Sequence, residues 1–125
     1  MAILNKRQRK VWYYLILQLG KSFCPGVPVT VRSTRMSDKF CGDCTGVIKL
    51  GRMVQIKIRI NSDSPWNTRL ETLIHEWAHA MEWEANWCEG GPKREHGPTW
   101  GVWYASIYEH VFDVLWDEWH EKNDD

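Results

Sequence analysis

Hydrophobic side chains recur along the chain at two different spacings, and these spacings separate helices from strands. The first run has the i, i+3, i+4, i+7 spacing of one helix face: Trp12, Leu15, Ile16 and Leu19. This spacing predicts an amphipathic helix over roughly 4–19, ended by Gly20. The same periodicity predicts a second helix over about 65–83 and a third over about 99–121.

Between the first two helices, apolar residues alternate with polar ones, which is the pattern of half-buried strands. The alternation predicts strands over 27–31, 40–50 and 54–60, and it is clearest in the last of these. We expect a small antiparallel sheet with one apolar and one basic face. Because the strands precede the last two helices rather than alternating with them, the order favours an α+β fold.

The composition fits one globular domain over 1–125. Of its 125 residues, 43% are hydrophobic, enough to form a core. No apolar run approaches the ~20 residues of a membrane span, so we expect no membrane association. The basic N-terminus and the apolar residues after it resemble a signal peptide, but aromatic and polar side chains interrupt the run and no small-residue cleavage site follows. We therefore expect a cytoplasmic protein with free thiols. The sequence leaves the oligomeric state open, and we favour a monomer.

The formal net charge of zero hides a division between the two halves. Residues 1–60 hold 12 Lys and Arg against 2 Asp and Glu, whereas residues 61–125 hold 4 against 14. One interpretation is that the halves attract each other. The other is a basic surface for an anionic partner such as single-stranded DNA, with Arg32, Lys57 and Arg59 on the open sheet face as candidate phosphate contacts.

The second predicted helix carries the sequence His75-Glu76-Trp77-Ala78-His79, an H-E-x-x-H motif. At positions i and i+4, two imidazoles lie on one helix face and can share a zinc ion. Glu76 is one residue step further round the helix, which places its carboxylate beside the metal. There it can take a proton from a zinc-bound water, so the motif predicts a catalytic Zn²⁺.

A catalytic zinc needs a third protein ligand and an open position for water. We favour His96, because a glycine-rich loop precedes it and can turn back toward the metal. Glu109 is the next choice, and Glu82, Glu84 and Glu95 are further carboxylate alternatives. For Cys41 and Cys44 we expect two half-buried thiols rather than a second zinc site, since a zinc ribbon needs two such pairs.

The combination of motifs resembles the SprT-like metallopeptidases, which include bacterial SprT and the eukaryotic DNA–protein crosslink protease Spartan. H-E-x-x-H is followed after 16 residues by His96-Gly97-Pro98-Thr99-Trp100, similar to the H-G-x-x-aromatic segment of that family. The resemblance extends upstream through 35–44 and 69–74. It departs at Thr99, where the family often has Glu, and we see no zinc-ribbon tail, so we expect a minimal protease core.

The resemblance implies a compact zincin-like core with His75, His79 and His96 as ligands and Glu76 as general base. It also implies that the strand over 54–60, with Ile56, Ile58 and Ile60, lines the substrate cleft and accepts an extended peptide by main-chain pairing. The candidates for stabilising the oxyanion are Tyr104, Tyr108 and Arg94, and nothing in the sequence selects one of them.

Two functions follow from these observations. The first is a zinc-dependent endopeptidase acting on a protein or peptide substrate, with DNA-bound proteins as the finer expectation. The second is a non-catalytic, zinc-stabilised module that binds nucleic acid or protein. Glu76 favours the first function, because a purely structural zinc site has no need of a base.

Overall fold

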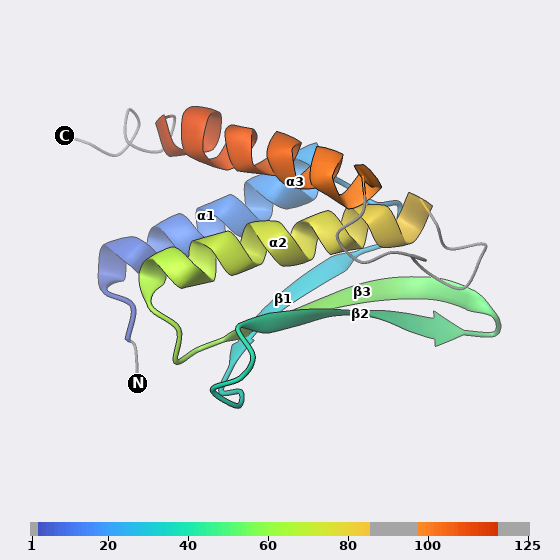
Figure 1. Ribbon diagram of the computed structural model, residues 1–125, viewed down its shortest axis with the longest axis horizontal. Coiled ribbons are helices and arrows are strands. Elements are labelled where there is room, and N and C mark those ends of the chain that lie inside the picture. The colour runs from blue at the N-terminus through green and yellow to red at the C-terminus, as the bar shows by residue number, and fades with distance from the viewer. Residues whose placement is uncertain (1–2, 86–97, 118–125) are drawn as a thin grey trace.

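The computed structural model describes residues 3–85 and 98–117, without the side chains at 83–85 and 114–115. Its elements follow the expected α-β-β-β-α-α order (Figure 1). Their bounds are α1 (Lys6–Ser22), β1 (Val29–Thr34), β2 (Gly42–Lys49), β3 (Arg52–Asn61), α2 (Trp66–Ala85), α3 (Pro98–Glu109) and the π-helical turn η2 (His110–Leu115). The α+β prediction is confirmed.

Helix α1 begins with a capping box and does not end at Gly20. The Asn5 side chain accepts a hydrogen bond from the Gln8 amide at 2.8 Å, and the Gln8 side chain accepts one from the Asn5 amide at 2.9 Å. At the other end, the Phe23 amide donates to the Leu19 carbonyl at 2.8 Å. The predicted stop at Gly20 is therefore wrong, because a glycine permits a helix end without requiring one.

The last helix also differs from the prediction. The α-helix ends at Glu109, and the next six residues form the wider turn η2. A period of 3.6 residues in the sequence does not distinguish a regular helix from a helix that contains one such turn.

The sheet is mixed rather than antiparallel. Its strand order is β1-β3-β2, with β2 and β3 antiparallel and β1 parallel to β3. Leu50 and Gly51, both with positive φ (53° and 76°), make the two-residue turn between β2 and β3. The chain passes from β1 to the far edge of the sheet before this hairpin brings β3 back between them. Residue alternation alone predicts strands but not their directions.

Strand β3 has an apolar and a basic face, as expected, but it does not line a cleft. Ile56, Ile58 and Ile60 are at most 1% exposed and belong to the core, while Lys57 and Arg59 between them are exposed. Both edges of β3 are already paired, one with β1 and the other with β2. The prediction that these isoleucines line a substrate cleft and that a peptide adds to β3 is therefore wrong.

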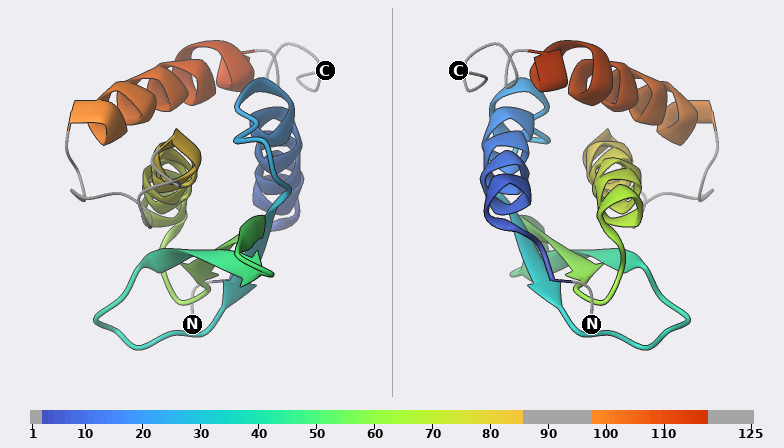
Figure 2. Two further views of the ribbon diagram at one scale, coloured as in Figure 1. Left: turned by 90° about the vertical axis from the view of Figure 1, so that its right-hand side faces the viewer. Right: turned by 90° about the vertical axis from the view of Figure 1, so that its left-hand side faces the viewer.

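The three helices gather over one face of the sheet (Figures 1 and 2). Helix α1 lies beside α2, and α3 crosses the helices on the side away from the sheet. Leu15 and Leu19 of α1, Trp77 of α2 and Ile107 of α3 meet the isoleucines of β3 in one hydrophobic core. The other face of the sheet carries no helix of the described chain.

The basic and acidic halves pack together, and an ion pair between described residues joins them. The Arg35 Nε atom in the basic half lies 3.1 Å from Asp63 Oδ2, near the start of the acidic half. The Arg35 guanidinium is largely exposed, so the pair contributes little to stability. No helix among the described residues is both long and apolar enough to cross a membrane.

Gly42 offers a test of how closely β2 approaches α2. A Cβ atom at this position would lie 2.5 Å from the Arg59 carbonyl oxygen and 2.7 Å from Thr72 Cγ2. We predict that Gly42→Ala lowers the free energy of unfolding by about 1–3 kcal/mol, because β2 must shift relative to both the β3 backbone and α2. Urea denaturation measures this change.

Gly101→Ala is the matched control, since a Cβ at Gly101 in α3 meets nothing within 4 Å. The added methyl group there should raise stability by about 0.5–1 kcal/mol through the helix preference of Ala over Gly. Equal unfolding midpoints for Gly42→Ala and the unmodified protein would show that the close approach does not constrain the fold.

Candidate metal centre

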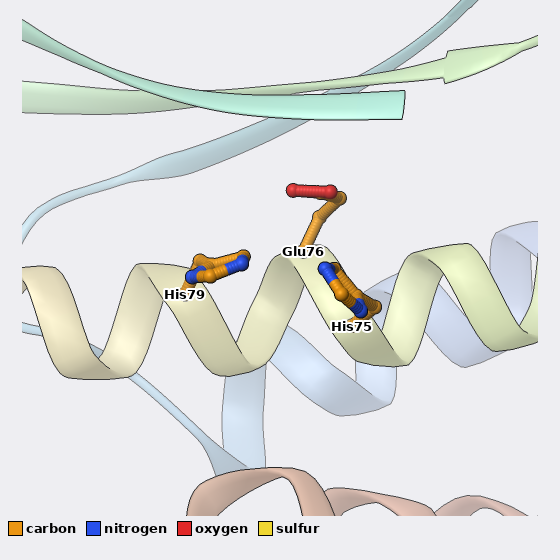
Figure 3. Close-up of side chains that lie close together, drawn as sticks. All are labelled: His75, Glu76 and His79. Carbon is orange, nitrogen blue, oxygen red and sulfur yellow. The ribbon is translucent and has the colours of Figure 1, made fainter. Parts of the chain in front are cut away.

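Helix α2 brings together three side chains that can hold a metal ion. One nitrogen from each of His75 and His79 and one carboxylate oxygen of Glu76 all lie within 4.8 Å of one another. In the described part of the chain this is the one group of three or more such residues. The two imidazoles lie on the same side of the helix, while Glu76 points toward the sheet (Figure 3). The predicted pair of ligands and the adjacent carboxylate therefore meet.

The two histidines are more exposed to solvent than the glutamate between them. His75 and His79 are half-buried, and their rings lie 4.9 Å apart between centroids. Glu76 is only 6% exposed. The imidazoles are thus accessible to solvent, whereas the Glu76 carboxylate is shielded from bulk water. The carboxylate is also close enough to exchange a proton with a ligand bound by the two imidazoles.

Trp100 holds both imidazoles, a role that the sequence did not reveal. Its ring centroid lies 5.1 Å from that of His75 and 5.7 Å from that of His79. Its indole N–H also donates to the His75 carbonyl at 3.3 Å. The sequence did mark Trp100 as the aromatic residue of the H-G-x-x-aromatic segment that follows the motif. That resemblance did not assign it any contact with the imidazoles.

Trp100 begins a row of aromatic side chains along α3 and η2. Neighbouring ring centroids in the row are 4.9 Å apart for Trp100 and Tyr104, 6.0 Å for Tyr104 and Tyr108, and 4.7 Å for Tyr108 and Phe112. The spacing of four residues places all four on one helix face. Aromatic contacts therefore run without a break from the imidazoles on α2 to Phe112 in η2.

A pocket of about 430 Å³ opens beside the group. It is lined by residues 39–42, by α2 residues that include His75 and Glu76, and by Tyr104 of α3. The strand at the pocket is therefore β2 and not β3. Sequence reasoning missed residues 39–42, because nothing in the alternation pattern shows which strand lies at the sheet edge beside α2.

Two groups near the pocket are held in their protonated forms. Burial raises the pKa of the Cys44 thiol, and the nearby carboxylates of Glu76 and Asp43 raise it further. Burial also raises the pKa of Tyr104, with smaller contributions from Glu71 and Tyr108. Burial thus favours the neutral thiol of Cys44, and Tyr104 remains a hydrogen-bond donor.

The cysteine prediction is half right. Cys44 is half-buried as expected, but Cys41 is exposed and lines the pocket. Both are free thiols in the structure, as is Cys24.

Other predicted site residues are not brought to this group or cannot be placed. His96 and Arg94 lie outside the described residues. Glu82 is buried and Glu109 is exposed, and neither belongs to the His-Glu-His group. Tyr108 is 43% exposed and does not line the pocket, whereas Tyr104 does.

The candidate phosphate contacts lie together on the open face of the sheet. Arg32 of β1 is paired in register with Arg59 of β3, and Lys57 is two residues before Arg59 on the same strand. All three side chains are exposed. Arg59 also forms an ion pair with Asp43 of β2, which neutralises part of the positive charge on this face.

The fold is α+β, and its helix α2 presents a His-Glu-x-x-His group beside an open pocket. The model of the SprT-like family matches residues 14–120, so the chain belongs to the SprT-like family. Membership supports a metallopeptidase-type function at the level of the family. Searches of curated proteins and of solved structures found no match.

The contact of Trp100 with both imidazoles predicts an effect on metal affinity. We expect Trp100→Leu to weaken zinc binding by about 10-fold or more, because side chains that orient metal ligands typically contribute this much. Competition with a chromophoric chelator measures the affinity. Trp103→Leu is the matched control, since Trp103 lies on the same helix and packs against Phe23 instead. Equal zinc affinities for the two variants would contradict the orienting role.

Proposed function

We propose that the protein is a zinc-dependent endopeptidase. The observation that carries this proposal is the meeting of two imidazole nitrogens and the Glu76 carboxylate within 4.8 Å at an open pocket. Two neutral imidazoles suit zinc, and His96 is the proposed third ligand that leaves the fourth position open. A zinc ion held there would supply Lewis acidity, which activates a water molecule and polarises a carbonyl group.

Glu76 acts in this proposal as the general base. Its carboxylate neighbours both imidazoles and is shielded from bulk water, so it can take the proton from the attacking water. The same carboxyl group then passes the proton to the amine of the leaving peptide. His75 and His79 remain neutral ligands throughout, oriented by the ring of Trp100.

The proposed substrate path follows the outer edge of β2, which pairs with no further strand of the described residues. This strand is the last in the order β1-β3-β2, and Gly42 at its start lines the pocket with His75 and Glu76. An extended peptide that pairs with the β2 backbone would present one of its carbonyl groups near the metal ligands. This path replaces the β3 path that the family resemblance implied.

The test is Glu76→Gln in the zinc-loaded protein. We expect the variant to keep its zinc and to lose cleavage of an unfolded protein substrate by about 10²–10⁴-fold, because the change removes the base but no metal ligand. Cleavage is followed by gel electrophoresis, and zinc content by elemental analysis.

Glu109→Gln is the control. Glu109 is exposed on α3, so its replacement should change neither activity nor zinc content. Loss of zinc from this variant would instead identify Glu109 as a ligand. A wild-type protein that holds zinc tightly but cleaves nothing would favour the alternative function, a zinc-stabilised binding module.

At a finer level, we propose that the substrates are proteins bound to DNA. Support comes from the open sheet face, where Arg32, Lys57 and Arg59 are exposed and adjacent in register. This face points away from the helices, so a nucleic acid strand bound there would leave the pocket beside α2 accessible.

The finer proposal predicts an effect of charge reversal on this face. Arg32→Glu with Lys57→Glu should weaken binding of single-stranded DNA by 10-fold or more. It should also reduce the salt dependence of log K by about 0.7 for each phosphate that the variant no longer neutralises. Fluorescence anisotropy at several salt concentrations measures both quantities.

The matched control is Lys10→Glu with Lys21→Glu. It reverses the same number of charges at exposed positions of α1, away from the sheet face. Equal losses of affinity in the two double variants would indicate a response to net charge only and would count against a specific nucleic-acid surface.

A further inference from the structure

The pocket beside the metal centre is lined by a tyrosine that could act on a bound substrate. We infer that the Tyr104 hydroxyl donates a hydrogen bond to the oxygen of the scissile carbonyl as this oxygen gains negative charge during attack. Tyr104 would thereby be a catalytic residue. The inference rests on the proposed endopeptidase function and deepens it.

The first argument is position. Tyr104 is the α3 residue that lines the pocket shared by His75 and Glu76. Tyr108, one helical turn further along, is 43% exposed and does not line this pocket. Of the two candidate tyrosines, the structure therefore brings one to the place where a peptide carbonyl would react.

The second argument is rigidity. The Tyr104 ring stacks on Trp100 at 4.9 Å with an angle of 29° between the rings, and Tyr108 packs against it at 6.0 Å. Trp100 in turn contacts both imidazoles. The ring of Tyr104 is thus held in a fixed relation to the metal ligands before any substrate binds. Donors fixed in advance stabilise developing charge most effectively, because they need no reorganisation during the reaction.

The third argument is the protonation state. An oxyanion needs a donor, and a phenol donates only while it keeps its proton. Burial and the neighbouring Glu71 carboxylate raise the pKa of Tyr104 above the usual value of a tyrosine. The hydroxyl group therefore keeps its proton at neutral pH and can donate it in a hydrogen bond.

Lys39 is the competing donor in the pocket. It lies in the loop before β2 and is exposed, with a long side chain that must lose conformational freedom to reach a fixed point. Tyr104, in contrast, is held by the stacked ring of Trp100. The hydroxyl group on the rigid ring is therefore the better donor for a charge that appears at one defined position.

The test compares Tyr104→Phe with Tyr108→Phe in the zinc-loaded full chain. Both variants keep the ring and lose only the hydroxyl group. For Tyr104→Phe we expect kcat on a fluorogenic peptide to fall by about 10²–10³-fold, the usual effect of losing one oxyanion donor, with KM within about 2-fold and zinc content unchanged. Tyr108→Phe should behave like the unmodified protein.

A binding measurement separates this role from a structural one. A phosphinic peptide, whose tetrahedral anionic group mimics the charged state, should bind Tyr104→Phe at least 10-fold more weakly than the unmodified protein in calorimetry. The corresponding uncleaved peptide, measured in the Glu76→Gln background, should bind equally well with and without the Tyr104 hydroxyl.

Three results would overturn the inference. Normal kcat and normal phosphinate affinity in Tyr104→Phe, together with an inactive Glu76→Gln, would reject the role of Tyr104 and leave the endopeptidase function standing. Loss of phosphinate affinity in Lys39→Met but not in Tyr104→Phe would assign the donor to Lys39. An unmodified protein that cleaves no peptide would reject the endopeptidase function, and the inference with it.

Discussion

The burial of helix α2 is the constraint on which the rest of the structure depends. From Thr72 to Met81 every side chain is buried except two, and these two are His75 and His79. The sheet covers this helix on one side and α3 crosses it on the other (Figure 2). Because the half-exposed positions are four residues apart, packing leaves one open stripe on the helix, and both candidate metal ligands occupy it.

The same burial fixes the environment of the Glu76 carboxylate, the proposed general base. Glu76 faces the sheet and shares its surroundings with the Cys44 thiol, whose pKa it raises. Burying a carboxylate costs free energy, and a cation bound to the adjacent imidazoles would offset this cost. The proposed metal binding and the proposed role of Glu76 as a base therefore depend on one arrangement of side chains. The row of rings that starts at Trp100 extends this arrangement into α3 and links ligand orientation to the shape of the pocket.

Local chemistry was predictable where it lies within one helix. The His-Glu-x-x-His group could be assigned from the sequence, because a helix converts a spacing of four residues into a shared face. The two faces of β3 could also be predicted, because successive side chains of a strand point to opposite sides of the sheet. Contacts between elements were not predictable in this way. The mixed sheet, the position of β2 beside α2 and the packing of Trp100 on both imidazoles all depend on how distant segments meet.

The proposed substrate path shows most clearly the difference between features set within one strand and features set by the packing of strands. Ile56, Ile58 and Ile60 have the sequence pattern of a strand with one apolar face, and the structure uses that face for the core. Which strand lies at the edge of the sheet depends on strand order, and the alternation of residues within β3 does not reveal that order. The sequence alone determined the approximate positions of the helices and strands and the shared helix face of the His-Glu-x-x-His group, since these follow from short-range periodicity. Only the tertiary structure decided which strand borders the pocket and which tyrosine enters it, because long-range packing sets both.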